Sequence, residues 1–467
     1  MRRIEGYGIY LGNSSHKMLT EEHSSLLLES NGGTTGSSSE DEVDQKHKIR
    51  AVPRLRQRAR LRNQLPRTLR RLGCYTLSAC VVCLMFFIYL PIIFFDVQPR
   101  QESLWDWTVN TSRDVKDYVL PQQDTALILP REFCRSKTFL IIAVCTGLNN
   151  FDRRQTIRET WGNTTEFNYN AFDKQHGHMA GRFLPVLAER LKLYADYLNN
   201  TGDTLNVSVR IVFIIGLGSS QDNETLTRLH NEATQYNDII QENFLDTYNN
   251  LTIKSVMALK QISHSCAKSS AYFLKCDDDT FVNVPNLLHM LLGGTVPLYN
   301  DTYGYYDHFS AQVLQPRNRM NATKNVLMGH VFCNVLPVTD TKSKWYMPFY
   351  MYQGSSYPKY LSGAGYVLSI DVVQRLYEAA LNTTLVYLED LYITGICAEH
   401  AKIKRASHPL FSFVHSQMAC AFKGSIIQHQ LKEENMLDAW RYVSNYSIQC
   451  PPPAYLTQLR LRLRSKC

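Results

Sequence analysis

The sequence predicts an α/β domain with a mainly parallel sheet, attached to a single membrane-spanning helix near the N-terminus. From Lys137 onward, short continuous apolar runs alternate with amphipathic stretches, and three consecutive aspartates follow one of these runs. The alternating runs and the aspartates after one of them together predict the α/β domain. The helix is predicted by residues 72–95, which form one long apolar segment without a charged side chain.

The apolar runs after Lys137 are short enough to be strands and apolar enough to be buried on both faces. Such strands, separated by helical patterns, are typical of a parallel sheet covered by helices on both sides, the nucleotide-binding class of architecture. The predicted strands are TFLIIAVCT (138–146), VSVRIVFIIG (207–216) and SAYFLKC (270–276), and the predicted helices cover 153–161, 223–236 and 252–266.

Residues 72–95 are long enough to cross the hydrocarbon core of a membrane as one helix. A cleaved signal peptide would lie at the extreme N-terminus, whereas a long polar segment comes first here. Eleven Lys and Arg lie between Lys46 and Arg71 without an acidic residue among them. This basic flank predicts a signal anchor with residues 1–71 in the cytosol and 96–467 in a lumen.

The composition of the C-terminal part agrees with a lumenal location. Ten Asn-x-Ser/Thr sequons follow the apolar segment and one precedes it. Nine of the twelve cysteines also follow it, in a compartment where disulfides persist. Their pairing does not follow from the sequence, and the odd number leaves at least one without an intramolecular partner.

Charge and composition distinguish the predicted tail, stem and folded domain. The formal net charge is +8, but the basic flank alone carries eleven positive charges, so the remainder of the chain is slightly negative. We therefore expect no nucleic-acid partner, because the folded part lacks an overall basic surface. Residues 1–71 read as a disordered tail ending in the basic segment, 96–133 as a stem without periodicity, and 134–467 as the folded domain.

The three aspartates 277–279 directly follow a predicted buried strand. Ligands of open α/β sheets bind at the carboxyl ends of strands, and adjacent carboxylates repel unless a cation or hydrogen-bond donors compensate them. Mg²⁺ and Mn²⁺ bind through carboxylates together with substrate phosphates. The segment therefore predicts a metal that holds a nucleotide diphosphate; the alternative is a solvated acidic turn.

Several separated motifs then occur in a recognisable order: IRETWG (157–162), VFIIG (212–216), ENFLDTYNNLTIK (242–254), KCDDD (275–279), YPKYLSGAGYVLS (357–369) and EDLYITG (389–395). Together they resemble the β-1,3-galactosyltransferase and β-1,3-N-acetylglucosaminyltransferase family (glycosyltransferase family 31) over about residues 137–450. The resemblance implies a GT-A (Rossmann-like) glycosyltransferase domain in a type II Golgi membrane protein. It also implies a UDP-sugar donor, Mn²⁺, an acceptor glycan on protein or lipid, and inversion at the anomeric carbon. The resemblance does not decide whether the protein forms a homo-oligomer.

The resemblance also implies roles for the acidic motifs. Asp279 would bind the metal, while Asp277 and Asp278 would lie near the ribose and the sugar of the donor. Asp390 would take the proton of the acceptor hydroxyl, with Glu389 beside it. The alternative for this second pair is structural, because acids are favoured in the first turn of a helix and LEDLYITGICAEHAKI has helical spacing.

Four further residues are site candidates. His429, in IIQHQLKEENMLDAW, matches a histidine that gives the family a further metal ligand, although a lone histidine is often structural. Arg158 suits bidentate contact with a phosphate or could close the pocket structurally. Gly363 and Gly365 would let the backbone approach the donor sugar, or form a simple turn.

Galactose is the favoured donor sugar, because YLSGAGYVLS is nearer to the galactosyltransferase form of this motif; an N-acetylglucosaminyltransferase is the alternative. Two other classes compete with an enzyme. One is a non-catalytic Golgi chaperone or lectin-like relative, which the intact acids disfavour. The other is a Ca²⁺-dependent adhesion domain, for which the chain lacks a matching Ca²⁺ loop.

Overall fold

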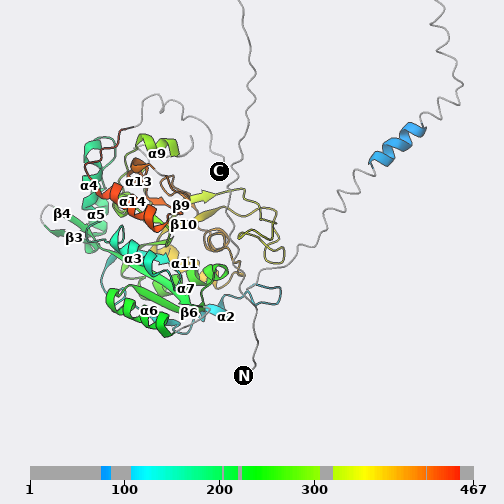
Figure 1. Ribbon diagram of the computed structural model, residues 1–467, viewed down its shortest axis with the longest axis horizontal. Helices are drawn as coiled ribbons and strands as arrows, with labels where there is room; N and C mark the ends of the chain where they lie inside the picture. Colours follow the sequence, from blue (N-terminus) through cyan, green and yellow to red (C-terminus); the bar gives the residue numbers. More distant parts are fainter. Residues whose placement is uncertain are drawn as a thin grey trace, which may run out of the picture. The chain divides into compact units, whose positions relative to one another are not determined.

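The computed structural model describes residues 75–85, 107–201, 204–218, 223–305, 319–416 and 418–452 (Figure 1). The chain divides into two compact units, Met1–Asp96 and Val97–Cys467. In the first unit only residues 75–85 are described, and they form an exposed helix inside the predicted anchor. No helix among the described residues is both long and apolar enough to cross a membrane. The rest of the predicted anchor, the tail 1–71 and residues 96–106 of the predicted stem lie outside the described residues.

The second unit is built on a mixed sheet of eight strands among the described residues, which confirms the α/β class. In spatial order they are β1 (Ala126–Ile128), β6 (Ile239–Leu245), β5 (Val209–Leu217), β2 (Thr138–Cys145), β7 (Ser270–Asp277), β10 (Tyr360–Ser369), β9 (Leu327–Phe332) and β11 (Ala406–Ser407). The four strands β6, β5, β2 and β7 run parallel, whereas β1 and β10 pair antiparallel with β6 and β7. The three predicted strands are β5, β2 and β7, which are neighbours in this parallel part.

Alternate residues of β2 explain why the whole strand is buried. Leu140, Ile142 and Val144 belong to one apolar core, and Ile141 and Ala143 to a second core on the opposite face. Helices contributing to the first core are α3 (Phe151–Glu159), α4 (Asn170–His176), α6 (Asn223–Tyr236), α8 (Val284–Leu291) and α14 (Glu433–Ser444). The second core receives α2 (Lys116–Val119), α7 (Leu251–Ser265), α11 (Ile370–Ala380), the π-helix η4 (Leu391–Cys397) and α12 (Ala398–His400). Two faces covered by helices are what the continuous apolar runs predicted.

The remaining elements are short and lie in the connections. They are η1 (Gly177–Met179), α5 (Ala188–Leu193), η2 (Ala195–Tyr197), β3 (Leu198–Thr201), β4 (Thr204–Val207), η3 (Tyr248–Asn250), β8 (Phe281–Val282), α9 (Asn300–Tyr305), α13 (Ala419–Gly424) and β12 (Ile427–Gln428). Disulfides join Cys134 to Cys266 and Cys420 to Cys450, and Cys333 is also disulfide-bonded.

Residues 107–133, which we expected in the stem, are part of the folded domain. Trp107 is buried in the second core, and β1 extends the sheet beyond β6. The ammonium group of Lys260 on α7 donates hydrogen bonds to the carbonyls of Val119, Leu120 and Gln123. This segment lacks visible periodicity because its elements are only three or four residues long. Pairing of β1 with β6 and the hydrogen bonds from Lys260 hold it in place.

Candidate active site

The acidic motif lies where the sequence placed it, at the carboxyl end of a parallel strand. β7 ends at Asp277, and Asp278 and Asp279 form the turn that leads into β8. Cys145, the last residue of β2, is in register with Asp277 and Ile214. The carboxyl ends of the central strands therefore meet at this edge, where open α/β sheets bind ligands.

The C-terminal segment brings His429 to the same edge. β12 pairs with β8, and the amide of Leu431 donates to the carbonyl of Asp279 at 2.9 Å. The Nδ1 atom of His429 lies 3.2 Å from the carbonyl of Phe413, so its Nε2 is left facing the acids. That Nε2 is 3.0 Å from Oδ1 of Asp279 and 3.8 Å from Oδ2 of Asp277. Asp277, Asp279 and His429 therefore form one cluster whose ligand atoms lie within 4.8 Å of one another.

This cluster fits a divalent cation. Oδ1 of Asp279 is buried and accepts no hydrogen bond from any residue that the structure describes, although it lies within ion-pair distance of His429. Burial alone would lower the pKa of His429, but the neighbouring Asp279 and Asp277 outweigh it and raise that pKa. Two carboxylates and an imidazole are a suitable ligand set for Mn²⁺, and a cation would coordinate this buried oxygen together with His429.

Asp278 differs from its two neighbours, because its carboxylate is committed to the protein. It is buried and accepts hydrogen bonds from Thr146 Oγ1 at 2.7 Å, from Asn150 Nδ2 at 2.7 Å and from Arg153 Nη1 at 3.0 Å. These donors come from the end of β2 and the start of α3. Asp278 thus fixes the acidic turn against that loop, and its predicted donor contact stays a prediction.

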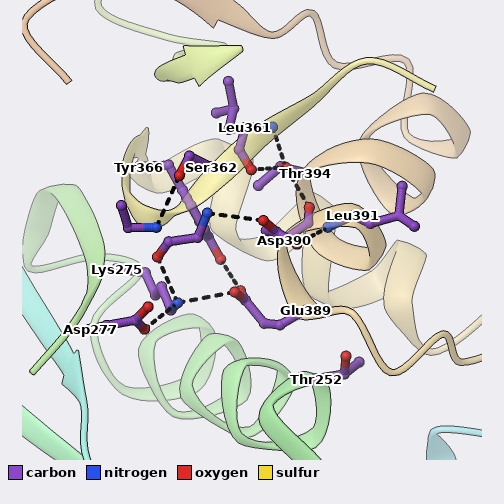
Figure 2. A network of polar contacts seen from close by, with 12 residues as sticks. Thr252, Lys275, Asp277, Leu361, Ser362, Tyr366, Glu389, Asp390, Leu391 and Thr394 are labelled. Carbon is purple, nitrogen blue, oxygen red and sulfur yellow. Dashed lines mark hydrogen bonds and ion pairs between the residues drawn. The ribbon is translucent and has the colours of Figure 1, made fainter. Parts of the chain in front are cut away.

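The second acidic pair begins a helix, as its spacing predicted. Asp390 is the N-cap residue of η4: its Oδ1 accepts from the amide of Leu391 at 2.8 Å and its Oδ2 from the amide of Gly363 at 3.1 Å (Figure 2). Burial, then the charge of Glu389, raises the pKa of Asp390 to about 6. A half-buried carboxylate with a pKa close to neutral pH suits a general base.

Lys275 connects the two acidic groups, a role that we did not predict. Its buried ammonium lies 2.8 Å from Oδ1 of Asp277 and 3.0 Å from Oε2 of Glu389, and donates to the carbonyl of Gly363 at 3.0 Å (Figure 2). Glu389 is buried as well, and its other oxygen accepts a hydrogen bond of 2.6 Å from the hydroxyl of Tyr366. Burial acts to lower the pKa of Lys275, but the surrounding acids hold it well above its usual value. The pair Lys275 and Glu389 therefore forms a charged link between the metal cluster and Asp390.

The two glycines of β10 differ in how closely they are packed. A Cβ on Gly363 would lie 3.4 Å from Cβ of Asp390, an ordinary contact distance, next to the hydrogen bond that orients this acid. A Cβ on Gly365 would lie 2.5 Å from Cδ1 of Ile427, in the strand that carries the C-terminal segment to the site. Gly363 thus lies in the site and Gly365 supports it; contact of either with a donor sugar stays a prediction.

Arg158 lies away from the acidic cluster. It is at the end of α3, whose start faces Asp278, and its guanidinium pairs with Asp238 at 2.8 and 2.9 Å and with Glu232 at 2.7 Å. Asp238 precedes β6, so this pairing is at the amino ends of the parallel strands, opposite the acidic edge. The residue of α3 that reaches the site is Arg153, which contacts both Asp278 and Glu433. Arg153 therefore replaces Arg158 in our account of the donor site.

We expect Arg158→Ala to destabilise the domain by about 2–3 kcal/mol, because Glu232 and Asp238 would lose a largely buried partner. UDP affinity should stay within twofold of wild type. Urea unfolding and calorimetric UDP titration check both parts, with Arg441→Ala, an exposed arginine paired with Asp438, as the control. A large loss of UDP affinity in a stably folded Arg158→Ala protein would return Arg158 to the donor site.

Lys275→Met should lower the free energy of unfolding by about 3–5 kcal/mol, since it leaves Glu389 buried and charged without its cation. Adding Glu389→Gln should restore part of that loss, which chemical denaturation of the double variant would measure. The matched control is Lys268→Met, at an exposed position near the start of the same strand. Unchanged stability of Lys275→Met would contradict the proposed link.

Comparisons with known proteins bear on what this site does. The family model described as Galactosyltransferase matches residues 188–307 and 298–409. Beta-1,3-galactosyltransferase 1 of Mus musculus is 30% identical over 68% of this chain and 77% of that protein. Lactosylceramide 1,3-N-acetyl-beta-D-glucosaminyltransferase A of Danio rerio is 33% identical over 60% of each chain. Among solved structures, an active-site mutant of LgtC aligns over 64% of this chain and 94% of that one, with 10% identity and a TM-score of 0.26, too low to support an argument.

Proposed function

Since the chain belongs to the galactosyltransferase family of β-1,3-glycosyltransferases, we propose that it transfers galactose from UDP-galactose to the 3-hydroxyl of an acceptor glycan, with inversion and with a divalent cation. The domain is then a GT-A glycosyltransferase domain. The observation that carries the proposal is the link through Lys275. Its ammonium contacts both Asp277 of the metal cluster and Glu389, the neighbour of Asp390.

Asp277, Asp279 and His429 would hold the cation. When bound, it would supply positive charge that stabilises the leaving diphosphate. Arg153, partly exposed beside Asp278 at the start of α3, is available for the same diphosphate. Asp277 is shared between this cluster and Lys275, whose ammonium offsets the negative charge of the neighbouring carboxylates.

Asp390 acts on the acceptor. As a carboxylate it accepts the proton of the acceptor 3-hydroxyl while that oxygen attacks the anomeric carbon and the bond to UDP breaks. The amides of Gly363 and Leu391 hold the carboxylate in one orientation. Glu389, held by Lys275 and Tyr366, is too committed to the protein to be the base; its charge helps to set the pKa of Asp390.

We further propose a type II membrane protein of the Golgi, with the catalytic domain lumenal and acting on glycans of proteins or lipids. The uncharged segment 72–95, its basic flank and the sequons after it support this topology. Immunostaining of the full-length chain together with a glycosidase shift test checks it. Sugars on a sequon after residue 95 are expected, and sugars at Asn13 would contradict the orientation.

The transfer reaction itself is tested with the full-length protein in detergent, incubated with UDP-galactose or UDP-N-acetylglucosamine and simple sugar acceptors. We expect Mn²⁺-dependent transfer from UDP-galactose. Transfer from UDP-N-acetylglucosamine alone would instead support the alternative donor. A folded protein that neither binds nor hydrolyses any UDP-sugar would be a non-catalytic relative.

A further inference from the structure

Two aromatic side chains stay exposed beside the proposed base. Tyr248 is 47% exposed and Trp345 is 51% exposed. Single exposed aromatic residues are common and need no explanation. Here, however, two of them share one cation: the ammonium of Lys344 lies 4.8 Å from the ring centre of Trp345 and 5.8 Å from that of Tyr248. The two rings therefore form one surface feature, which we call the aromatic platform.

The platform lies at the same edge of the sheet as the acidic groups. Tyr248 begins η3 directly after β6, whose carboxyl end is at the edge where β7 ends in Asp277. Asp390 lies three residues after Tyr387, whose hydroxyl is bonded to the backbone on either side of Trp345. Tyr248 and Trp345 are thus on segments that meet at the edge of the sheet with the proposed base.

The backbone on both sides of the platform is fixed to the segment that carries the base. The hydroxyl of Tyr387 donates to the carbonyls of Lys344 and Tyr346 at 3.1 and 2.7 Å, on either side of Trp345. From the other side, the hydroxyl of Thr252 at the start of α7 donates to the carbonyls of Val386 and Tyr387 at 2.8 and 3.0 Å. The backbone that carries Trp345 is therefore fixed relative to the segment that carries the base, and preorganisation of this kind lowers the cost of binding.

We propose that Tyr248 and Trp345 form the acceptor subsite, stacking on the apolar face of the pyranose that presents its 3-hydroxyl to Asp390. This inference rests on the proposed function. A pyranose has an apolar face of C–H groups and a rim of hydroxyls. Amphipathic aromatic rings match the face, and the exposed ammonium of Lys344 can donate to the rim.

The test distinguishes an effect on acceptor binding from an effect on donor binding. It uses full-length protein that transfers sugar. Trp345→Ala should raise the KM for the acceptor about tenfold, as expected for the loss of one aromatic stacking contact. The KM for the UDP-sugar and the affinity for UDP should stay within twofold. Tyr248→Phe should have a smaller effect than Tyr248→Ala, because the ring remains. The matched control is Tyr446→Ala, which removes an exposed ring that faces Lys174 and Glu166 instead.

A second measurement does not depend on turnover. Titration of the wild-type protein with the acceptor sugar should change tryptophan fluorescence, and Trp345→Phe should remove most of that change. Unchanged acceptor KM and unchanged fluorescence in the Trp345 variants would overturn the subsite, as would a rise in the donor KM alone. A wild-type protein without transfer from any UDP-sugar would defeat the proposed function instead, and the fluorescence titration would still decide whether the platform binds a sugar.

Discussion

Asp390→Asn is expected to reduce sugar transfer by about 10²–10⁴-fold, the contribution of a positioned general base. The amide has nearly the size of the carboxylate, and its oxygen can still accept a hydrogen bond from Gly363 or Leu391. The fold and the metal cluster should therefore survive, and calorimetry should find UDP affinity within twofold of wild type. Initial rates of transfer with saturating donor and acceptor measure the loss directly.

The control for this substitution is Asp438→Asn, which removes an exposed aspartate of α14 paired with Arg441. Its rate should equal that of the wild type. Glu389→Gln is the informative comparison, because glutamine keeps an oxygen for Tyr366 but loses the charge that faces Lys275. If Asp390→Asn retained more than a tenth of the wild-type rate, another group would be the base.

The pH dependence of transfer gives the same assignment an independent check. The pKa of Asp390 is raised to about 6, mainly by burial and next by the charge of Glu389, while Lys275 and the amides of Leu391 and Gly363 act against the rise. The base acts only when ionised, so activity present above this pKa should be lost as the pH falls through about 6. Glu389→Gln removes the neighbouring negative charge and should move this acidic limb to lower pH.

The other large effect is expected for Asp279→Asn. It removes a carboxylate from the cluster that would hold the cation, and the buried Oδ1 of Asp279, 3.0 Å from His429 Nε2, is a central ligand atom of that cluster. We expect the Mn²⁺-dependent binding of UDP to weaken more than about 100-fold, beyond the 10–100-fold typical for loss of a group that only supports a metal ligand. Calorimetric titration of UDP with Mn²⁺, and again with EDTA, measures it.

Asp278→Asn is the matched control from the same turn. The carboxylate of Asp278 is occupied by Thr146, Asn150 and Arg153, so its loss should reduce stability more than metal dependence. Equal UDP affinity with Mn²⁺ and with EDTA in the wild-type protein would contradict the metal assignment outright.

The sequence predicted the central part of the fold well because that part is governed by local pattern. The apolar runs at 138–146, 207–216 and 270–276 are three of the four parallel strands β6, β5, β2 and β7. The helix starting at Glu389 follows from acids placed before an apolar periodic stretch. The antiparallel strands β1 and β10 were not predicted. One is three residues long, and the other contains two glycines, of which Gly365 is explained by the side chain of Ile427 packed against it.

The site could be predicted only in part, since its members come together through tertiary contacts. Pairing of β12 with β8 brings His429 to Asp279, and only the family resemblance indicated it. Lys275 did leave a signal, because a lysine inside an apolar strand must find buried acids. Arg158 was the only arginine considered from the sequence, and the structure places it away from the acidic edge for a geometric reason. Five residues along α3 separate Arg153, which contacts Asp278, from Arg158, which contacts Asp238.

The most direct test of the account is the structure of the product formed by the full-length protein from UDP-galactose, Mn²⁺ and a glycan acceptor. NMR of that product gives both the linked carbon and the anomeric configuration. One base on the acceptor side and one cation on the leaving diphosphate predict a β-linked galactose on the acceptor 3-hydroxyl. An α-linked product, or a product formed equally well by Asp390→Asn, would contradict it.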